Sequence, residues 1–320
     1  MLLIRNRKTV PPELRAGSVA TVGSFDGLHL GHRHILGQVR ARARELELPA
    51  AVVAFEPAPK EFFARTAPPA RLMRFREKFA GLAEFGIDVF YCPRFDAAMA
   101  ARTPAEFIDE LLLGVLNVKY LVVGDDFRFA RQRSGSVTDL EHAGAAAGFT
   151  VEQVPTVVSG GLRASSSGVR AALAAGDLAA AARQLGRPYR MAGQVVAGQQ
   201  LGRELGMPTA NVRLKRSQSP LQGVFAVRVS GIGDDRWHDG VASIGTRPTV
   251  NGVEPLLEVH IFDFAKDIYG AHIQVEFIAK LRDEQYFPDL ETLAEHMQRD
   301  AEHAREQLRV YSGQPRTHCD

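Results

Sequence analysis

The chain has 320 residues, of which 45% are hydrophobic and 24% are charged. This composition is ordinary for a globular protein, and at roughly 100 to 200 residues per domain it predicts two domains. Lys and Arg number 39 against 37 Asp and Glu, which leaves a net charge of +2. Such a balance gives no electrostatic reason to expect a nucleic-acid or membrane partner.

Cysteine content and the N-terminal residues bear on the cellular compartment. Cys92 and Cys319 are the only cysteines, too few for a disulfide framework or a cysteine zinc site, which favours a reducing compartment. The N-terminal sequence MLLIRNRKTVPPELR has an apolar run too short for a signal peptide. No window approaches the ~18 apolar residues of a membrane span. We therefore expect a soluble, cytoplasmic protein.

Residues 18–155 alternate short apolar runs with segments of helical periodicity. The expected strands are Val19–Val22, Ala50–Phe55, Val89–Tyr91, Tyr120–Val123 and Thr150–Val154. The expected helices between them are Arg33–Glu45, Phe75–Phe85, Pro104–Leu113 and Val137–Ala147. This alternation predicts a parallel sheet covered on both faces, with ligands bound beyond the carboxyl ends of the strands. Segments 23–31, 56–59 and 124–129 each follow a strand, so we expect them to gather at that edge.

Two further helices and a break follow. Ser165 can cap a helix, Gly176 can end it, and Asp177 can cap the next helix, Leu178–Leu185. Gly186-Arg-Pro-Tyr189 suits neither a helix nor a central strand. We place a domain boundary there, between residues 1–187 and 188–320.

Beyond the boundary, the apolar runs are short, alternating and separated by Gly, Pro or Asp. They are Met191–Val196, Thr209–Leu214, Gly223–Val229, His238–Ile244, Leu256–Phe264 and Ile273–Phe277. No helical pattern separates them, which predicts an antiparallel sheet or a small barrel. From Asp289 onward, apolar residues recur at helical spacing, which predicts a C-terminal helix packed on the side of the barrel.

The stretch SVATVGSFDGLHLGHRHILGQV, residues 18–39, combines a strand, a glycine-bearing turn and a helix start. This layout places backbone N–H groups and the positive end of a helix dipole against a phosphate. His29 and His32 can face the same way, and imidazoles there would meet charge developing on a phosphate. Gly31 leaves room for a ligand near the backbone. Two solvated histidines explain the pair alone equally well, and a zinc site lacks an evident third ligand.

A second candidate site begins in the glycine-rich stretch 198–206, which leads into Pro208-Thr-Ala-Asn211. The stretch lacks the GKS or GKT ending of a P-loop. Thr209 and Asn211 offer neutral oxygens that suit a magnesium ion bound to nucleotide phosphates. A polar turn that enters a strand is the simpler explanation of this stretch on its own.

Alternation along Leu256–Phe264 gives the strand two different faces. Leu257, Val259 and Ile261 share one face, and Glu258, His260 and Phe262 share the other. A mixed face of this kind is usually a solvated strand surface. If it lines a pocket instead, Glu258 is a candidate base for a primary hydroxyl group.

The first site resembles a known family. Gly23-Ser-Phe-Asp-Gly-Leu-His-Leu-Gly-His32 is similar to the HxGH signature of nucleotidyltransferases, in the GxFDGxHxGH form of bacterial FAD synthetases. Ser167-Gly-Val-Arg170 matches the second family motif, and Gly124-Asp-Asp-Phe-Arg-Phe129 resembles the segment between them. The resemblance implies a Rossmann-like nucleotidyltransferase domain that transfers the adenylyl group of ATP to FMN.

The same resemblance implies residue roles. His29 and His32 would stabilise the triphosphate in the transition state, and Ser167 and Arg170 would contact the leaving phosphates. The remaining expected ATP contacts are Gly23, Phe25, Asp26 and Gly31, and the expected flavin contacts are Asp126 and Phe127. Family members often carry Arg where Gly168 stands, so this chain lacks a cation there.

The second site resembles riboflavin kinase. The matching motifs are GxxLGRxLGxPTAN, GVFAV, GTRPTV, LEVHIFDF, DxYG and LRDEQYF, which cover residues 190–305 almost continuously. The resemblance implies a small antiparallel barrel with a C-terminal helix. It also implies transfer of the γ-phosphoryl group of ATP to the 5′-hydroxyl of riboflavin.

The kinase resemblance assigns Gly202, Gly206, Thr209 and Asn211 to MgATP, with Thr209 and Asn211 as the Mg²⁺ ligands. Glu258 would be the catalytic base. Two more residues, Arg282 and Tyr286, lie where the family closes over flavin.

Together the two resemblances predict a bifunctional riboflavin kinase/FAD synthetase. Its expected ligands are riboflavin, ATP, Mg²⁺, FMN and FAD, and we expect a monomer or weak homo-oligomer. Three alternatives stay open: an enzyme with one active half, a flavin- or nucleotide-binding regulator without turnover, and a nucleic-acid-binding module. The last lacks a basic stripe with interleaved aromatic residues.

Overall fold

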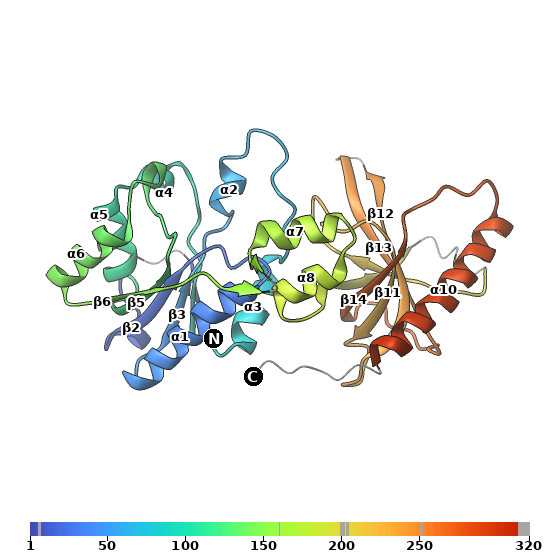
Figure 1. Ribbon diagram of the computed structural model, residues 1–320, viewed down its shortest axis with the longest axis horizontal. Coiled ribbons are helices and arrows are strands. Elements are labelled where there is room, and N and C mark those ends of the chain that lie inside the picture. The colour runs from blue at the N-terminus through green and yellow to red at the C-terminus, as the bar shows by residue number, and fades with distance from the viewer. Residues whose placement is uncertain (6–7, 160, 199–201, 203–204, 250–251, 313–320) are drawn as a thin grey trace. The chain divides into compact units, whose positions relative to one another are not determined.

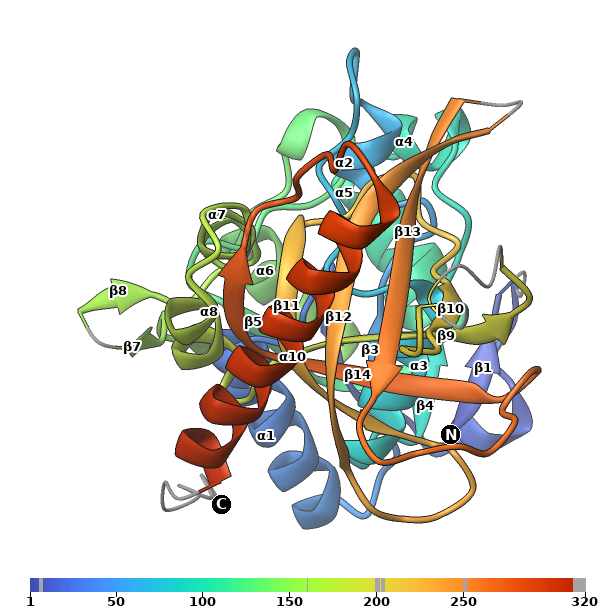
Figure 2. The ribbon, with the colours of Figure 1, turned by 90° about the vertical axis from the view of Figure 1, so that its right-hand side faces the viewer.

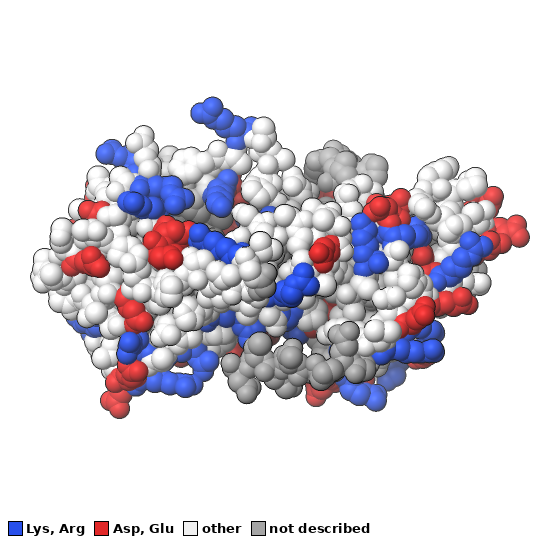
Figure 3. Space-filling view, viewed as in Figure 1, with Lys and Arg blue, Asp and Glu red and all other residues white. Residues whose placement is uncertain are grey.

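A computed structural model describes the chain except residues 6–7, 160, 199–201, 203–204, 250–251 and 313–320 (Figure 1). The chain divides into two compact units. The first contains residues 1–69 and 78–164, and the second contains residues 70–77 and 165–320. On the face drawn in Figure 3, acidic and basic side chains are interspersed, as the near-neutral net charge suggests.

The first unit is built on a six-stranded sheet in which all neighbouring strands are parallel. Its spatial order is β1-β4-β3-β2-β5-β6. The strands are β1 (Leu2–Ile4), β2 (Ser18–Val22), β3 (Ala50–Val53), β4 (Val89–Tyr91), β5 (Val118–Gly124) and β6 (Thr150–Val154). A short hairpin of β7 (Val158–Ser159) and β8 (Leu162–Arg163) follows. The predicted parallel sheet is confirmed.

Helices cover both faces of this sheet. They are η1 (Pro12–Leu14), α1 (Leu30–Glu45), α2 (Pro59–Phe62), α3 (Phe75–Glu84), α4 (Ala97–Ala101), α5 (Pro104–Phe107), η2 (Ile108–Leu113), η3 (Arg131–Arg133) and α6 (Val137–Ala147). α1 contacts β2, β3 and β5, while α5, η2 and α6 contribute to the core on the other face. The first three residues of α3, 75–77, belong to the second unit, and the rest of the helix belongs to the first.

Local sequence explains where these helices begin and end. Ser136 caps α6 through a hydrogen bond from the Asp139 N–H and a reciprocal bond from its own N–H to the Asp139 carboxylate. Gly148 ends the helix with a φ of 78°, a left-handed conformation that glycine adopts without strain. α1 begins at Leu30, earlier than the predicted Arg33, because His29 caps it.

The strand order creates a switch point at β2. From β2 the chain proceeds outward through β3 and β4 on one side, and later through β5 and β6 on the other. In such sheets ligands bind where the loops after the two central strands diverge. Here those loops are 23–29 after β2 and 125–130 after β5.

The second unit contains a closed barrel in the order β10-β13-β12-β11-β14-β9. The strands are β9 (Tyr189–Val196), β10 (Ala210–Arg213), β11 (Gly223–Ser230), β12 (His238–Thr249), β13 (Gly252–Ile261) and β14 (His272–Arg282). Every neighbouring pair is antiparallel. Alternate residues point inward, so Val212, Phe225 and Leu257 fill the barrel core. The predicted barrel is confirmed.

The C-terminal helix α10 (Leu290–Ser312) packs on the outer face of β11 and β12 (Figure 2). Ala304 and Leu308 are buried there against Val224, Ala226 and Val241. Where the helix covers them, these strands carry apolar residues on both faces, because one face meets the barrel core and the other meets the helix.

α7 (Ser166–Ala174), α8 (Leu178–Leu185) and segment 70–77 complete the second unit. The segment is fixed by the buried Arg216, which lies 2.6 Å from the Glu77 carboxylate and also donates to the Arg71 carbonyl oxygen. The Tyr189 hydroxyl donates to the Leu72 carbonyl oxygen at 2.9 Å. A buried ion pair whose guanidinium also donates to a backbone carbonyl oxygen favours one specific arrangement of the segment.

Candidate active sites

The first candidate site is the loop that connects β2 to α1. Phe25, Gly27 and Leu28 have positive φ angles of 47°, 90° and 48°. Left-handed backbone at two non-glycine residues is a strain that usually accompanies a functional loop. Phe25 and Asp26 are buried at 1% and 8% exposure, so the loop is folded tightly into the unit.

His29 and His32 lie together at the start of α1. Their rings stack with centroids 3.7 Å apart, and the Phe25 ring lies 4.9 Å from the His32 ring. His29 caps the helix because its Nδ1 accepts the His32 backbone N–H at 3.4 Å. Because Nδ1 accepts this bond, a neutral His29 carries its proton on Nε2. A Cβ at Gly31 would lie 3.2 Å from the His29 ring, so glycine lets the ring sit over the helix start.

His32 is held in its neutral form. Burial lowers its pKa well below the ordinary value, and the neighbouring His29 and Lys78 lower it further. Its Nδ1 is enclosed and has no hydrogen-bond partner among the described residues. The lowered pKa favours the neutral imidazole over the cation at this position.

The loop after β5 carries the predicted Asp126 and Phe127. The Asp126 carboxylate accepts a hydrogen bond from the Arg163 guanidinium at 2.5 Å, and both side chains are more than half exposed. Phe127 stacks on Phe129 with centroids 5.7 Å apart. Gly124, which ends β5, faces both Asp126 and Ile35 of α1, so the end of β5 lies close to α1.

The Phe127–Phe129 pair extends into a continuous row of aromatic rings that we did not predict. Ring centroids 5.0 to 6.3 Å apart connect its members, which are Phe127, Phe129, Phe107, Phe55, Phe95, Phe62 and Phe63. Phe62 and Phe63 are 40% and 62% exposed. Phe55 and Phe95 each follow the carboxyl end of a strand, β3 and β4 respectively. Their shared position after neighbouring parallel strands was the sequence feature from which this row could have been predicted.

Ser167 and Arg170 lie on α7, in the second unit. Ser165 caps this helix as predicted, because its hydroxyl accepts the Gly168 N–H at 3.0 Å. Arg170 Nε donates to the Ala70 carbonyl oxygen at 2.7 Å. A Cβ at Gly168 would meet the amide oxygen of the buried Gln184 at 2.4 Å, so that amide occupies the space above Gly168. The ATP contacts of Ser167 and Arg170 stay predictions.

The second site follows from strand register. Asn211 lies opposite Glu258, Glu258 opposite Ser243, Ser243 opposite Val224, and Val224 opposite Arg282. Directly opposed residues point to the same face of a sheet. The row therefore crosses the outer face of the barrel, and Glu258 stands between a side-chain amide and a hydroxyl group.

A cavity of about 280 Å³ opens along this row, and we call it the α10 cavity. Glu258, Ser243 and Arg282 line it from the barrel, while Leu293, Met297 and Asp300 line it from α10. The predicted face with Glu258 and His260 thus borders a cavity. Leu257, Val259 and Ile261 point into the barrel core.

Arg282 is fixed at the rim of the α10 cavity. Its Nε and Nη2 donate to the Asp300 carboxylate at 3.0 and 2.7 Å, and its guanidinium lies 5.4 Å from the Phe287 ring centre. This bidentate geometry fixes the orientation of the Arg282 guanidinium. The predicted Tyr286 is 94% exposed and is not among the residues that line the cavity, so its flavin contact stays a prediction.

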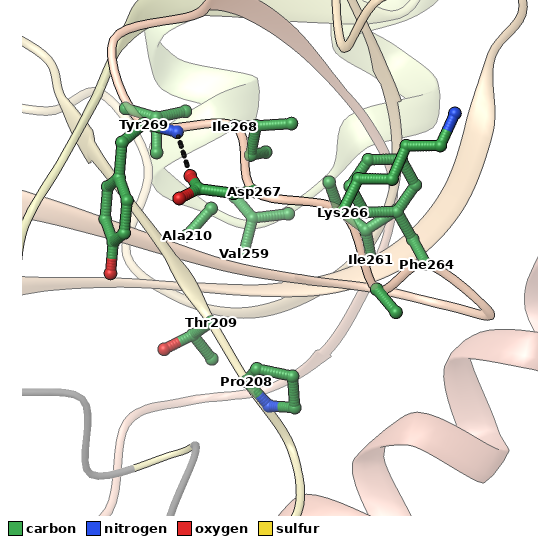
Figure 4. Close-up of a pocket in the computed structure, with 12 residues that line it drawn as sticks. Pro208, Thr209, Ala210, Val259, Ile261, Phe264, Lys266, Asp267, Ile268 and Tyr269 are labelled. Atoms are coloured by element: carbon green, nitrogen blue, oxygen red, sulfur yellow. Dashed lines mark hydrogen bonds between the residues drawn. The ribbon is translucent and has the colours of Figure 1, made fainter.

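A second cavity of about 300 Å³, the loop cavity, lies beside the segment 264–269 (Figure 4). Val195, Val259 and Ile261 give it an apolar floor, and Lys266 and Tyr269 contribute polar groups. Thr209 lines both cavities. It is the residue at which a group held in one cavity could meet a group held in the other.

Close packing around Thr209 and Asn211 explains the glycines that precede them. A Cβ at Gly198 would lie 2.2 Å from the Asn211 amide nitrogen, and one at Gly202 would lie 3.3 Å from the Thr209 hydroxyl. Gly206 has a φ of 77°. Much of the predicted 198–206 stretch lies outside the described residues. Among those described, no cluster of three His, Cys, Asp or Glu side chains could hold a metal ion.

The fold and the two sites define the class of protein. A parallel α/β unit with paired histidines at its switch point, and a closed barrel with a carboxylate in a cavity on its outer face, are each arranged to bind a small ligand. They define a two-unit protein with a separate candidate ligand site in each unit.

Comparison with known proteins gives the family. The FAD synthetase profile matches residues 12–168, and the riboflavin kinase profile matches residues 185–308. The bifunctional riboflavin kinase/FMN adenylyltransferase of Escherichia coli K12 is 48% identical over 306 residues, which cover 96% of this chain and 97% of that protein. The enzyme of the same name from Haemophilus influenzae is 43% identical over 289 residues, covering 90% and 94%. The chain belongs to the bifunctional riboflavin kinase/FMN adenylyltransferase family, as the sequence motifs predicted.

Similarity to a solved structure extends over nearly the whole chain. A crystal structure titled as a macrolide-efflux protein from Streptococcus pneumoniae aligns with a TM-score of 0.81 and 29% identity, over 95% of this chain and 99% of that one. The likeness supports the fold. Among the described residues of the present chain, no helix is long and apolar enough to cross a membrane.

Proposed function

We propose that this chain catalyses two successive reactions. It phosphorylates riboflavin to FMN with ATP, and it adenylates FMN with a second ATP to give FAD and pyrophosphate. The observation that carries the proposal is that one chain contains both matched family regions, FAD synthetase over 12–168 and riboflavin kinase over 185–308. The first reaction makes the phosphate monoester that the second one needs.

In the kinase reaction, riboflavin would occupy the α10 cavity with its 5′-hydroxyl beside Glu258. The hydroxyl oxygen bonds to the γ-phosphorus of ATP, the bond from that phosphorus to the bridging oxygen breaks, and ADP leaves. The hydroxyl proton passes to the Glu258 carboxylate. Ser243 and Asn211 flank this carboxylate by strand register, and they would hold it toward the acceptor.

The nucleotide would occupy the loop cavity. Its apolar floor suits the adenine ring, and the boundary position of Thr209 lets the phosphates reach the α10 cavity. His260 would hold the backbone next to Thr209 in place, because its Nδ1–H donates to the Pro208 carbonyl oxygen at 2.9 Å.

Thr209 and Asn211 suit magnesium by the chemistry of their side chains. Both offer neutral oxygens, and Mg²⁺ bound to ATP usually takes few protein ligands and keeps phosphate and water oxygens. Mg²⁺ bound there would neutralise charge on the phosphates during transfer. Gly202 and Gly206 would let the backbone approach the same phosphates.

In the adenylyl reaction, a phosphate oxygen of FMN bonds to the α-phosphorus of ATP, the bond from that phosphorus to the β-phosphate oxygen breaks, and pyrophosphate leaves. His29 would donate from Nε2, and the neutral His32 would hydrogen-bond within the same cluster. Gly23, Phe25, Asp26 and Gly31 would shape the phosphate loop. Positioning and hydrogen bonding suffice here, without a covalent nucleophile.

The flavin of this second reaction would stack on the row of phenylalanines. Exposed rings at Phe62 and Phe63 offer the apolar platform that a flat isoalloxazine ring needs. Asp126 and Phe127 would border it. Ser167 and Arg170 would contact the leaving phosphates, a role that comes from the family motif alone.

The functional boundary would fall between residues 187 and 188. We further propose a cytoplasmic enzyme that is a monomer or weak homo-oligomer.

Incubating the purified full-length chain with riboflavin and MgATP tests the function. Chromatography should show FMN and then FAD. Accumulation of FMN alone, even when FMN and ATP are supplied directly, would refute the adenylyl activity. Binding of flavin without either product would instead identify a regulator.

A further inference from the structure

Lys78 of α3 is a buried lysine that neither the motifs nor the family assignments mention. It is only 7% exposed, and lysine is rarely buried unless its charge has a specific partner. Its ammonium donates to the Ser24 carbonyl oxygen at 2.6 Å. Ser24 belongs to the β2–α1 loop, directly before the left-handed Phe25.

This contact joins α3 to the tightest part of the first site. Ser24 precedes Phe25, whose ring lies against His32, so displacement of the Ser24 carbonyl group would move the surface on which His32 rests. Lys78 also lies near enough to His32 to lower its pKa, together with burial and His29. The ammonium is therefore close to both the turn and the histidine pair.

We infer that Lys78 is a positioning residue for adenylyl transfer: its ammonium fixes the Ser24–Phe25 turn and places a positive charge beside the loop proposed to bind the triphosphate. The inference rests on the proposed function. A lysine is suited to both tasks, because one compact cation can hold a carbonyl oxygen and attract an anion through the same loop.

Substitution of Lys78 separates its charge from its packing. Lys78→Met keeps the length of the side chain without its charge, and Lys78→Arg restores a cation. Lys119→Met, at an exposed position on β5 of the same unit, is the matched control. We expect Lys78→Met to raise the KM for ATP in FMN adenylylation about tenfold, the effect of one charge-assisted hydrogen bond, with a smaller change in kcat. Lys78→Arg should recover part of the loss.

Hydrogen exchange of the β2 amides in the same preparations reports whether the first unit folds, and riboflavin phosphorylation should remain within about twofold of the parent chain. Unchanged adenylylation kinetics in Lys78→Met would overturn the inference, and so would equal losses in Lys78→Arg and Lys78→Met. If Lys78→Met loses both activities, Lys78→Gln replaces it, since it keeps a hydrogen-bond donor for Ser24. Full adenylylation by that variant would then refute a role for the charge. Absence of adenylylation in the parent chain would instead refute the proposed function.

Discussion

The two candidate sites are built in opposite ways. The first is almost one continuous peptide, since the loop and helix start at 23–32 supply its histidines, its glycines and its strained turn. The second is assembled by strand register from Asn211, Ser243, Glu258 and Arg282, which lie far apart in the chain. A contiguous site depends on local backbone conformation, whereas an assembled site depends on the integrity of the whole barrel.

The largest expected effect tests the assembled site. Glu258→Gln keeps the size and register of the side chain but removes the base, so riboflavin phosphorylation should fall ~10³-fold. Adenylylation of supplied FMN should be unchanged. Chromatographic rates with riboflavin and with FMN measure the two separately.

Glu254→Gln is the matched control, because Glu254 lies on the same strand with an exposed side chain. It should leave both rates unchanged. A loss below about tenfold in Glu258→Gln would mean that another group accepts the hydroxyl proton.

The contiguous site should respond to a single histidine. His29→Ala removes both the proposed Nε2 donor and the helix cap, so FAD formation from FMN should fall ~10²-fold. His34→Ala, further along α1, serves as the control. Because the change is local, riboflavin phosphorylation should stay intact, and an equal loss of both activities without unfolding would contradict separate sites.

The same difference explains what sequence alone could predict. Short continuous apolar runs were sufficient for the parallel sheet, because its central strands are buried on both faces. Alternation with a period of two was sufficient for the barrel and for the two faces of β13. The first candidate site could be predicted because its residues are consecutive in the sequence, at 23–32. β1 was missed because three residues at a sheet edge carry too little pattern.

Features created by long-range packing gave no such signal. The pairing of Arg216 with Glu77 spans 139 residues, so residues 70–77 could not be assigned to the barrel unit beforehand. The row of phenylalanines gathers rings from the ends of β3, β4 and β5. The alternation around Glu258 predicted its face, but the alignment of Ser243 and Asn211 beside it depends on register, which is fixed only in the folded barrel.

A smaller effect should follow from weakening the Arg282–Asp300 ion pair at the edge of the α10 cavity. Asp300→Asn removes the charge that holds Arg282 in its bidentate pair, and one such interaction is typically worth about tenfold in rate or affinity. We expect the KM for riboflavin to rise by that factor while adenylylation stays constant. Glu295→Gln, on an exposed turn of α10, is the control, and an equal effect of both changes would exclude a specific role for Arg282.

The smallest effect concerns pH and singles out the contiguous site. Because the pKa of His32 is lowered in the folded chain, the unfolded chain binds a proton below pH ~6.5 that the folded chain does not. His32 therefore stabilises the first unit fully above that pH, and the free energy of unfolding should decrease by up to ~1.4 kcal/mol per pH unit below it. Hydrogen exchange of the β2 amides measures this opening, and His32→Asn should reduce the slope. Trp237 is the only tryptophan and lies in the barrel unit, so its fluorescence should show the same pH dependence in both proteins; equal β2 slopes would mean that His32 is not the group responsible.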